Sequence, residues 1–385
     1  MSIKEANDTM SISHPSRRNL MLSAGALGLI ATLGSQEALA FGKKDKTAEA
    51  PNSDIFFPNA NAAALSGIKR VVIANYVIAF QTEASDFREA TRFNKAETAA
   101  SNAWENFDVG LMQEITDAGY ARLKADFISH GIEVLDTSVL ASQPAYRTIQ
   151  TATGFGSPAY WGNGDGKAVL VAATGLAPFQ SYGPETGNFE LYNGKSDGGA
   201  PNPPTMMKRL KPYQLPGWEI DLAKALDAVV VKAWQVVDFG KVEAGANRWG
   251  FGGGGGTLDR AEHTANASSH VRIREEQSRL SFRLPGSTNR KGESVRQIPA
   301  THMAPPKDGD VVVAVGNPIF LGSDLFTLSD SGETSGQRLT GFLLGGAKHI
   351  NIAAHLTDPG LYKSRVSGAV NSLMDSFVNA ALGTP

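Results

Sequence analysis

Histidine pairs are the first residues to consider for metal chemistry, because imidazole is a common ligand of transition metals. His349 and His355 are six residues apart, and His263 and His270 are seven apart. Neither spacing is the four-residue interval that places two imidazoles on one face of a helix. Glu262 and the second pair flank one expected loop and could converge there, but we interpret them as solvated loop residues. We therefore expect no metal site.

Three motifs with serine or glycine could carry nucleophilic or phosphate chemistry. Ser66–Lys69 has the Ser-x-x-Lys spacing but runs directly into an expected strand. Gly332–Gly336 has its serine one place too late for a nucleophile elbow. Gly252–Gly256 lacks the Lys-Ser or Lys-Thr that follows the glycines of a phosphate-binding loop. Because no catalytic motif is complete, we expect no catalytic residue and no bound cofactor.

Composition excludes several further classes of protein. The 385 residues contain no cysteine, which excludes disulfides, thiolate zinc sites, cysteine-bound iron–sulfur clusters and a lipoprotein anchor. The net charge is -2, whereas a general nucleic-acid binder is normally basic. Hydrophobic residues make up 42% of the chain, enough to bury a sizeable core. We expect a folded protein without a nucleic-acid partner.

Aromatic residues in glycine-rich loops are the remaining candidates for binding. Tyr160 and Trp161 lie among the glycines of one long loop, and Trp249 and Phe251 precede the glycine run of a second. Exposed rings can stack on a glycan, contact a lipid-like molecule or pack against a partner protein. The alternative is that these rings seal the core beneath the loops. We predict a binding role, above all at Trp249 and Phe251, since the neighbouring glycines expose them.

The first 40 residues have the pattern of a secretory signal. The pair Arg17 and Arg18 comes before an apolar stretch that runs to Leu33, and Ala38 and Ala40 form a small-x-small cleavage pattern. The arginine pair resembles a twin-arginine (Tat) signal. This resemblance implies export of the folded protein through the Tat translocase to the periplasm, with a peripheral association with the envelope left open. The alternative is an ordinary secretory signal that contains Arg-Arg.

Behind the signal peptide (1–40) we expect a mobile lead-in at 41–66 and a single α/β domain at 67–385. Two long loop insertions, at about 150–216 and 243–268, interrupt this domain. No stretch of the mature chain reaches the about 20 apolar residues that a transmembrane helix needs. We therefore expect no transmembrane segment in the mature chain.

Hydrophobic periodicity predicts the first elements of the domain. Lys69–Phe80 is apolar on both faces, which predicts a strand covered on both sides. A polar stretch at 81–105 is expected to be a loop. A helix follows over Phe107–His130, capped by Gly131, and a short strand over Ile132–Leu135. The apolar stripe of this helix is Met112, Ile115, Gly119, Leu123 and Phe127.

The second half of the domain contains mostly strands. The alternation over His270–Leu284 changes phase, which predicts a bulge or bend near Glu275–Ser278. Asp358 and Pro359 start a closing helix, as a cap followed by a first-turn proline. A mixed sheet with helices on at least one face follows, an α/β (α+β) fold. The other expected elements are a helix at 218–226 and strands over Ala228–Phe239, Asp310–Phe320 and His349–Ala354.

Two pieces of this pattern resemble the periplasmic α/β module of the TolB N-terminal and CsgG type. The first is Val71–Phe80 followed by Met112–Phe127 and Ile132–Leu135, and the second is the step from Leu222–Leu226 into Ala228–Phe239. The resemblance implies a protein of the cell envelope. The chain departs from the CsgG family in lacking the cysteine that carries that family's lipid anchor.

Two hypotheses about function remain. The first, which we favour, is a non-catalytic periplasmic binding or envelope-assembly protein. Its aromatic loops would contact an envelope protein or a glycan or lipid-like ligand. The second is an exported enzyme, such as an oxidoreductase, that carries a non-covalent cofactor, as many proteins with Tat signals do.

Overall fold

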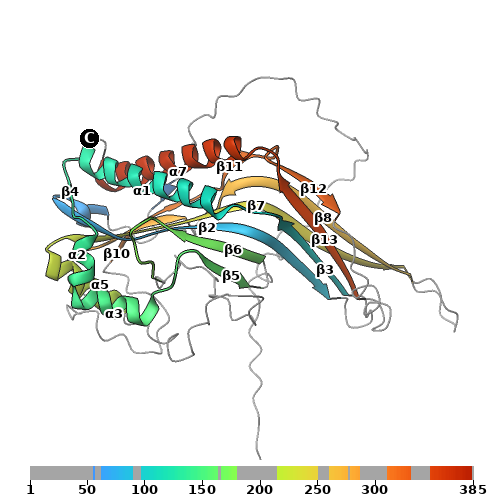
Figure 1. Cartoon of the computed structure of the whole chain (residues 1–385), viewed down its shortest axis with the longest axis horizontal. Coiled ribbons are helices and arrows are strands. Elements are labelled where there is room, and N and C mark those ends of the chain that lie inside the picture. Colours follow the sequence, from blue (N-terminus) through green and yellow to red (C-terminus); the bar gives the residue numbers. More distant parts are fainter. Residues whose placement is uncertain are drawn as a thin grey trace, which may run out of the picture. The chain divides into compact units, whose positions relative to one another are not determined.

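A mixed β-sheet with helices on both faces forms the body of the fold (Figure 1). It is seen in a computed structural model. This structure describes residues 55–56, 62–89, 97–163, 166–179, 215–249, 260–275, 278–286, 310–330 and 347–383.

The elements in chain order are β1 (Ile55–Phe56), η2 (Ala62–Leu65), β2 (Arg70–Glu89), β3 (Glu97–Trp104), α1 (Val109–Ser129), β4 (Glu133–Val134), α2 (Ser138–Ser142), α3 (Pro144–Thr153), β5 (Ala159–Asn163), β6 (Gly166–Ala172), α5 (Leu215–Leu226), β7 (Val229–Trp249), β8 (Arg260–Ile273), β9 (Arg279–Arg283), β10 (Asp310–Val315), β11 (Ile319–Gly322), β12 (Phe326–Asp330), β13 (Ala347–Leu356) and α7 (Pro359–Leu382).

The described strands join one 13-stranded sheet, with the central order β1-β10-β9-β7-β2-β3-β13-β12. The pairs β2–β7 and β3–β13 are parallel, whereas β2–β3 and β7–β8 are antiparallel. These findings confirm the predicted mixed sheet with packed helices.

The first halves of β2 and β7 form the centre of the sheet. They pair in parallel from Val71 opposite Val229 to Phe80 opposite Val237. Every residue from Val71 to Phe80 is buried, because the sheet is covered on both faces here. The predicted strand covered on both sides is therefore confirmed.

The second halves of these strands are longer than the sequence predicts. The expected loop at 81–105 is wrong, because β2 continues to Glu89 and β3 returns antiparallel from Glu97 to Trp104. The residues there are mostly small or polar and give no apolar alternation. Cross-strand pairing and packing against other strands supply the stability that their own strand propensity does not.

The helices α1 and α7 lie side by side on one face of the sheet (Figure 1). Asp108 caps α1 by accepting a hydrogen bond from the Gly110 N–H at 2.7 Å, and Asp358 caps α7 through the Leu361 N–H at 3.0 Å. The predicted apolar stripe of α1 is buried throughout, and α7 buries a stripe of its own that includes Tyr362, Val366 and Leu373. Gly131 has a φ of +72°, as expected of a glycine just beyond a helix end.

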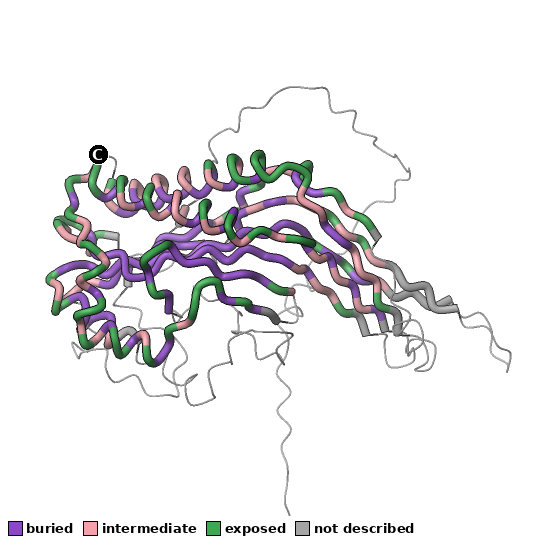
Figure 2. The backbone as a smooth tube through the Cα atoms, in the orientation of Figure 1, coloured by how far each residue is buried: buried purple, intermediate pink, exposed green. Residues whose placement is uncertain are grey.

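The opposite face of the sheet carries α3 and α5, which pack against each other. Figure 2 shows buried residues along the central strands and on the inner sides of the helices. A second, smaller core lies between β2, β5, β6 and β7 and includes Val77, Leu170 and Trp234. The expected lead-in contributes β1 and η2 to the fold, since β1 pairs with β10.

Two later predictions need correction. The alternation over His270–Leu284 belongs to two separate strands, β8 and β9, rather than to one strand with a bulge or bend, and the break between them lies at the predicted position. Both strands pair with β7, and this explains why their apolar residues change phase. Within the expected strand Asp310–Phe320, the chain forms β10 and then β11, which pair with different neighbours.

Candidate binding site

β2 and β7 separate beyond Phe80 and Val237 and continue as two antiparallel strand pairs. We call residues 83–89 of β2 with 97–103 of β3 the first strand pair. Residues 240–249 of β7 with 260–269 of β8 form the second strand pair. Both pairs extend past the ends of α1 and α7 (Figure 1). Each therefore has an outer face that these two helices do not cover.

Side chains of β2 replace the backbone partner that β7 loses where the strands separate. The Gln81 Oε1 accepts a hydrogen bond from the Phe239 N–H at 3.2 Å, and the Asp86 Oδ2 accepts one from the Ala244 N–H at 2.9 Å. A buried backbone N–H without a partner would cost free energy comparable to a lost hydrogen bond. These two contacts hold the strand pairs in a fixed relation.

Small residues fill the space between the two strand pairs. Because alanine side chains are short, the facing backbones can approach closely while still excluding water. The buried members are Ala84, Ala100, Val242 and Ala244, with Ala265 and Ala267 packed against them.

A cluster of aromatic rings anchors the base of the strand pairs. The Trp104 ring centroid lies 5.0 Å from that of Phe326, 5.3 Å from that of Tyr362 and 6.2 Å from that of Phe239. These rings come from β3, β12, α7 and β7, so the cluster ties both strand pairs to the helix layer. Burial raises the pKa of Tyr362, so its hydroxyl stays protonated at physiological pH.

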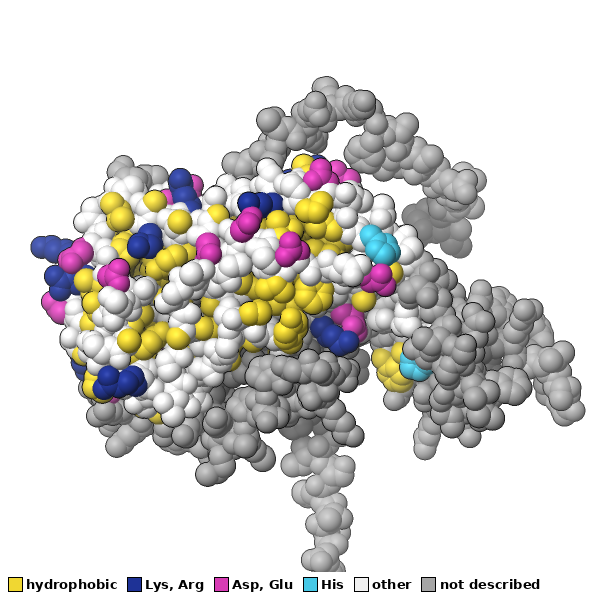
Figure 3. Space-filling model, in the orientation of Figure 1, with side chains coloured by type: hydrophobic (Ala, Val, Ile, Leu, Met, Phe, Trp, Pro, Cys, Tyr) yellow, Lys and Arg dark blue, Asp and Glu magenta, His cyan; other side chains and the backbone are white. Residues whose placement is uncertain are grey.

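Exposed rings lie on the outer faces of this region. Phe87 of the first strand pair is 52% exposed, and Phe320, which is paired with β8, is 63% exposed. The Phe320 ring lies 5.9 Å from that of His270. Burial, followed by the charge of Arg272, lowers the pKa of His270, which keeps its ring uncharged at neutral pH. On the face seen in Figure 3, apolar side chains form a broken band among interspersed charges of both signs.

The predicted binding residues fall in different environments. Trp249 is the last residue of β7, opposite Arg260 at the far end of the second strand pair, and Phe251 lies outside the described residues. On β5, Tyr160 is 44% exposed, whereas Trp161 is 5% exposed and belongs to the second core. The structure therefore separates the two neighbouring rings onto opposite faces of one strand. The signal residues Arg17, Arg18, Ala38 and Ala40 also lie outside the described part.

Sequence reasoning missed Phe87 and Phe320 as candidates. Phe87 stands in a stretch that has no apolar periodicity, so nothing in the sequence marks it as a strand residue with an outward side chain. Phe320 follows the buried Ile319, and this alternation was the available signal. Phe87 becomes a candidate only when its strand partner is known.

The buried charges of the described part hold the fold together. The Glu219 carboxylate of α5 is fully buried and lies 3.0 Å from the Lys232 Nζ and 3.2 Å from the Arg283 Nε. This contact joins α5 to β7 and β9. The Asp238 carboxylate likewise receives Arg274 at 2.6 Å and Arg272 at 3.1 Å.

Within the residues that the structure describes, no group of three His, Asp or Glu side chains could hold a metal ion. The described helices include none that is both long and apolar enough to cross a membrane. No protein-family model matches the sequence, and neither a curated protein nor a solved structure matches it.

Proposed function

We propose that the chain is a non-catalytic binding or assembly protein of the cell envelope. It is exported to the periplasm by its Tat-like signal, and it contacts a partner through the far ends of the two strand pairs. The resemblance to the TolB N-terminal and CsgG type of module agrees with this location.

The observation that carries the proposal is the continuation of β2 and β7 beyond the helix layer. The two strands are 20 and 21 residues long, and they pair with each other only over their first halves. Their second halves add little apolar core, since alanine and valine fill the space between them. A long, fixed projection of this kind suits contact with another molecule better than it suits stabilisation of the body.

The residues on the projection indicate the chemistry of the partner. The exposed ring of Phe87 lies on the first strand pair, and Trp249 ends β7, whereas the exposed ring of Phe320 lies nearer the body of the fold, opposite Arg272 of β8. Exposed rings are typical of surfaces that contact proteins or stack on sugars. An envelope protein, a glycan or a lipid-like ligand fits this surface.

Replacement of Trp249 and Phe251 by alanine tests the proposal. The double variant should lose capture of envelope components while its melting temperature stays nearly unchanged. Ile128→Ala is the matched control, because Ile128 is also a large exposed apolar residue (60% exposed) but lies on α1. Equal capture by the double variant and the control would refute a role for this end of the molecule.

The purified folded protein distinguishes the proposal from the cofactor-carrying enzyme. We expect a colourless protein without a stoichiometric metal. A chromophore or metal at one equivalent per chain would favour the enzyme.

A further inference from the structure

Three polar contacts join α1 to α7 along their length. Glu114 contacts Lys363, Arg122 contacts Asp375, and the His130 ring contacts the Gly383 carbonyl. The partners are 249, 253 and 253 residues apart, so the two helices run in the same direction. The separation grows by four residues, about one helical turn, between the first contact and the second. The first contact is exposed, whereas the second lies beside the buried carboxyl group of Asp126.

The middle contact brings two carboxylates to one guanidinium. The Arg122 Nη2 donates to the Asp375 Oδ2 at 2.7 Å, and the Arg122 Nε reaches the Oδ1 of Asp375 and, at 3.0 Å, the Oδ1 of Asp126. Asp126 is only 7% exposed, and its Oδ2 has no hydrogen-bond partner in the described part of the chain. One guanidinium compensates one carboxylate, so the second carboxylate is stable here only when it carries a proton.

The electrostatic surroundings of Asp126 agree with this geometry. Burial, then the hydrogen bond and the charge of Asp375, raise the pKa of Asp126 to about 7, although Arg122 and His130 act in the opposite direction. Because this pKa is raised, the stability that the proton gives to the folded protein is present in acid and is lost as the pH rises through about 7.

The third contact lies at the ends of the two helices. The His130 Nδ1 lies 2.8 Å from the Asp126 carbonyl oxygen, and its Nε2 lies 2.8 Å from the Gly383 carbonyl oxygen. The ring therefore lies between two backbone acceptors, one near the end of each helix.

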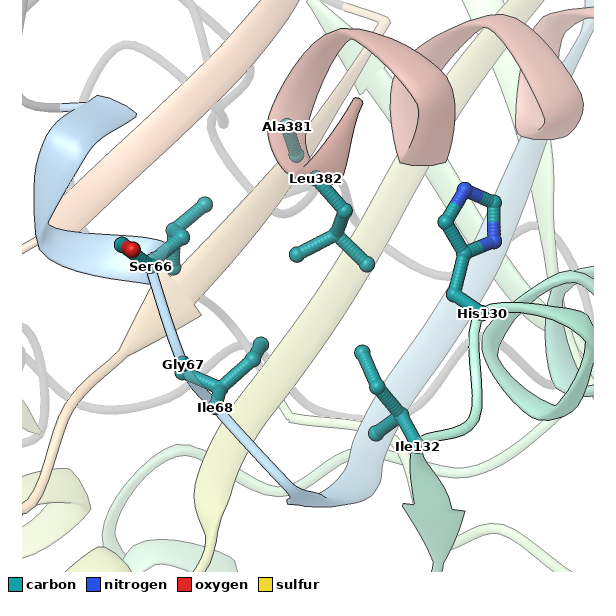
Figure 4. Close-up of a pocket in the computed structure, with 8 residues that line it drawn as sticks. Ser66, Gly67, Ile68, His130, Ile132, Ala381 and Leu382 are labelled. Carbon is teal, nitrogen blue, oxygen red and sulfur yellow. The ribbon is translucent and has the colours of Figure 1, made fainter. Parts of the chain in front are cut away.

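A pocket lies directly beside this third contact. It has a volume of about 340 Å³ and lies between the ends of α1 and α7 and the turn that follows η2 (Figure 4). Among the lining residues that the structure describes, His130 is the sole ionisable one. The others are Leu65, Ser66, Gly67, Ile68, Ile132, Ala381 and Leu382. The end of α7 thus lies next to free space and apolar side chains, with no second charged group of the lining to hold it.

We propose that the C-terminal half of α7 is a pH-sensitive clasp, closed on α1 when Asp126 carries a proton and loosened when Asp126 has lost it. Four groups face one another here: Arg122, Asp126 and His130 on α1 and Asp375 on α7. Ionisation of Asp126 places a second carboxylate beside that of Asp375 on the single guanidinium of Arg122. Loosening moves Ala381 and Leu382 and so changes the pocket.

Hydrogen exchange of the full-length protein at pH 5.5 and pH 8 tests the clasp. After correction for the intrinsic pH dependence of exchange, the protection of residues 371–383 should fall about tenfold or more at pH 8, since each unit of pKa shift corresponds to tenfold. In Asp126→Asn, which keeps the shape but cannot ionise, most of this pH dependence should vanish. Unchanged wild-type protection between the two pH values would overturn the proposal, as would an Asp126→Asn response equal to that of the wild type.

Two further variants keep the test decisive. Lys363→Gln removes only the exposed contact with Glu114, so it should keep the full pH dependence. Asp375→Asn leaves one carboxylate on Arg122, so the loss of protection should move to lower pH. This variant replaces Asp126→Asn if the latter does not fold. If the midpoint pH of the loss of protection then stayed at the wild-type value, the proposal would be overturned.

Discussion

Gly119 of α1 lies directly over the side chain of Tyr76 in β2. A Cβ atom at position 119 would come within 2.1 Å of the Tyr76 hydroxyl and within 2.6 Å of the Val370 Cγ1 on α7. Both neighbours are fully buried, and the Tyr76 hydroxyl lies 3.4 Å from the Gln235 Nε2. Two helices and the sheet therefore meet at a point where only a residue without a side chain fits.

Gly119→Ala should destabilise the protein. Overpacking of a filled core costs about 1–3 kcal/mol, and neither Tyr76 nor Val370 has space to move. Chemical denaturation measures the free energy of unfolding. The matched control is Gly368→Ala on α7, where an added Cβ meets nothing within 4 Å. This control should gain about 0.5–1 kcal/mol from helix propensity. A stabilised Gly119→Ala would contradict the close packing of α1.

The space between the two strand pairs should reject larger side chains. Ala100 is 3% exposed and faces the second strand pair, whereas its neighbour Ala99 faces outward and is half-buried. We expect Ala100→Leu to cost about 1–3 kcal/mol and Ala99→Leu to cost less than about 1 kcal/mol. Urea denaturation of both variants checks the difference. Equal costs would mean that the pairs do not pack through their alanine face.

Glu219→Ala should be one of the most damaging single changes in α5. It leaves Lys232 and Arg283 without the buried carboxylate between them, and breaking a buried ion pair costs roughly 3–5 kcal/mol. Glu133→Ala is the comparison, because the ion pair of Glu133 with Arg70 is exposed and should contribute less than about 1 kcal/mol. The melting temperatures of the two variants should differ widely. Similar values would show that the buried contact is dispensable.

Replacement of both Arg17 and Arg18 by lysine should block export if the signal is of the Tat type. Lysine keeps the charge of the segment, so an ordinary secretory signal would continue to work. Fractionation of cells that express the full chain measures the periplasmic share. Normal export of the Lys-Lys variant would contradict the Tat assignment and leave the ordinary signal as the explanation.

Part of the fold could be predicted from local patterns. The paired first half of β2, the stripe of α1 and the capped start of α7 were predicted correctly, because each element buries apolar residues at its own period. The continuation of β2 to Glu89 was not predicted. This part of β2 pairs with β3, which begins at Glu97. β3 pairs in turn with β13, which begins at Ala347, about 250 residues later in the chain. Stability that comes from pairing over such distances leaves no mark on the local sequence.

The candidate site was predicted less completely than the fold. The glycines next to Trp249 were the reason for predicting a binding role there, and this residue does lie at the end of a strand pair. The same reasoning selected Tyr160 and Trp161 together, although β5 exposes one ring and buries the other. A strand turns successive side chains to opposite faces, so two neighbouring rings rarely serve one surface. Phe87 could be found only after its strand was known.

Site-specific photocrosslinking in cells tests the central claim most directly. A photoreactive residue at position 249 or 87 of the full chain should form a discrete crosslinked product with an envelope component, whereas the same residue at position 128 on α1 should form none. Crosslinking at position 128 alone, or no product at positions 249 and 87 with export intact, would show that the two strand pairs are not the contacting surface.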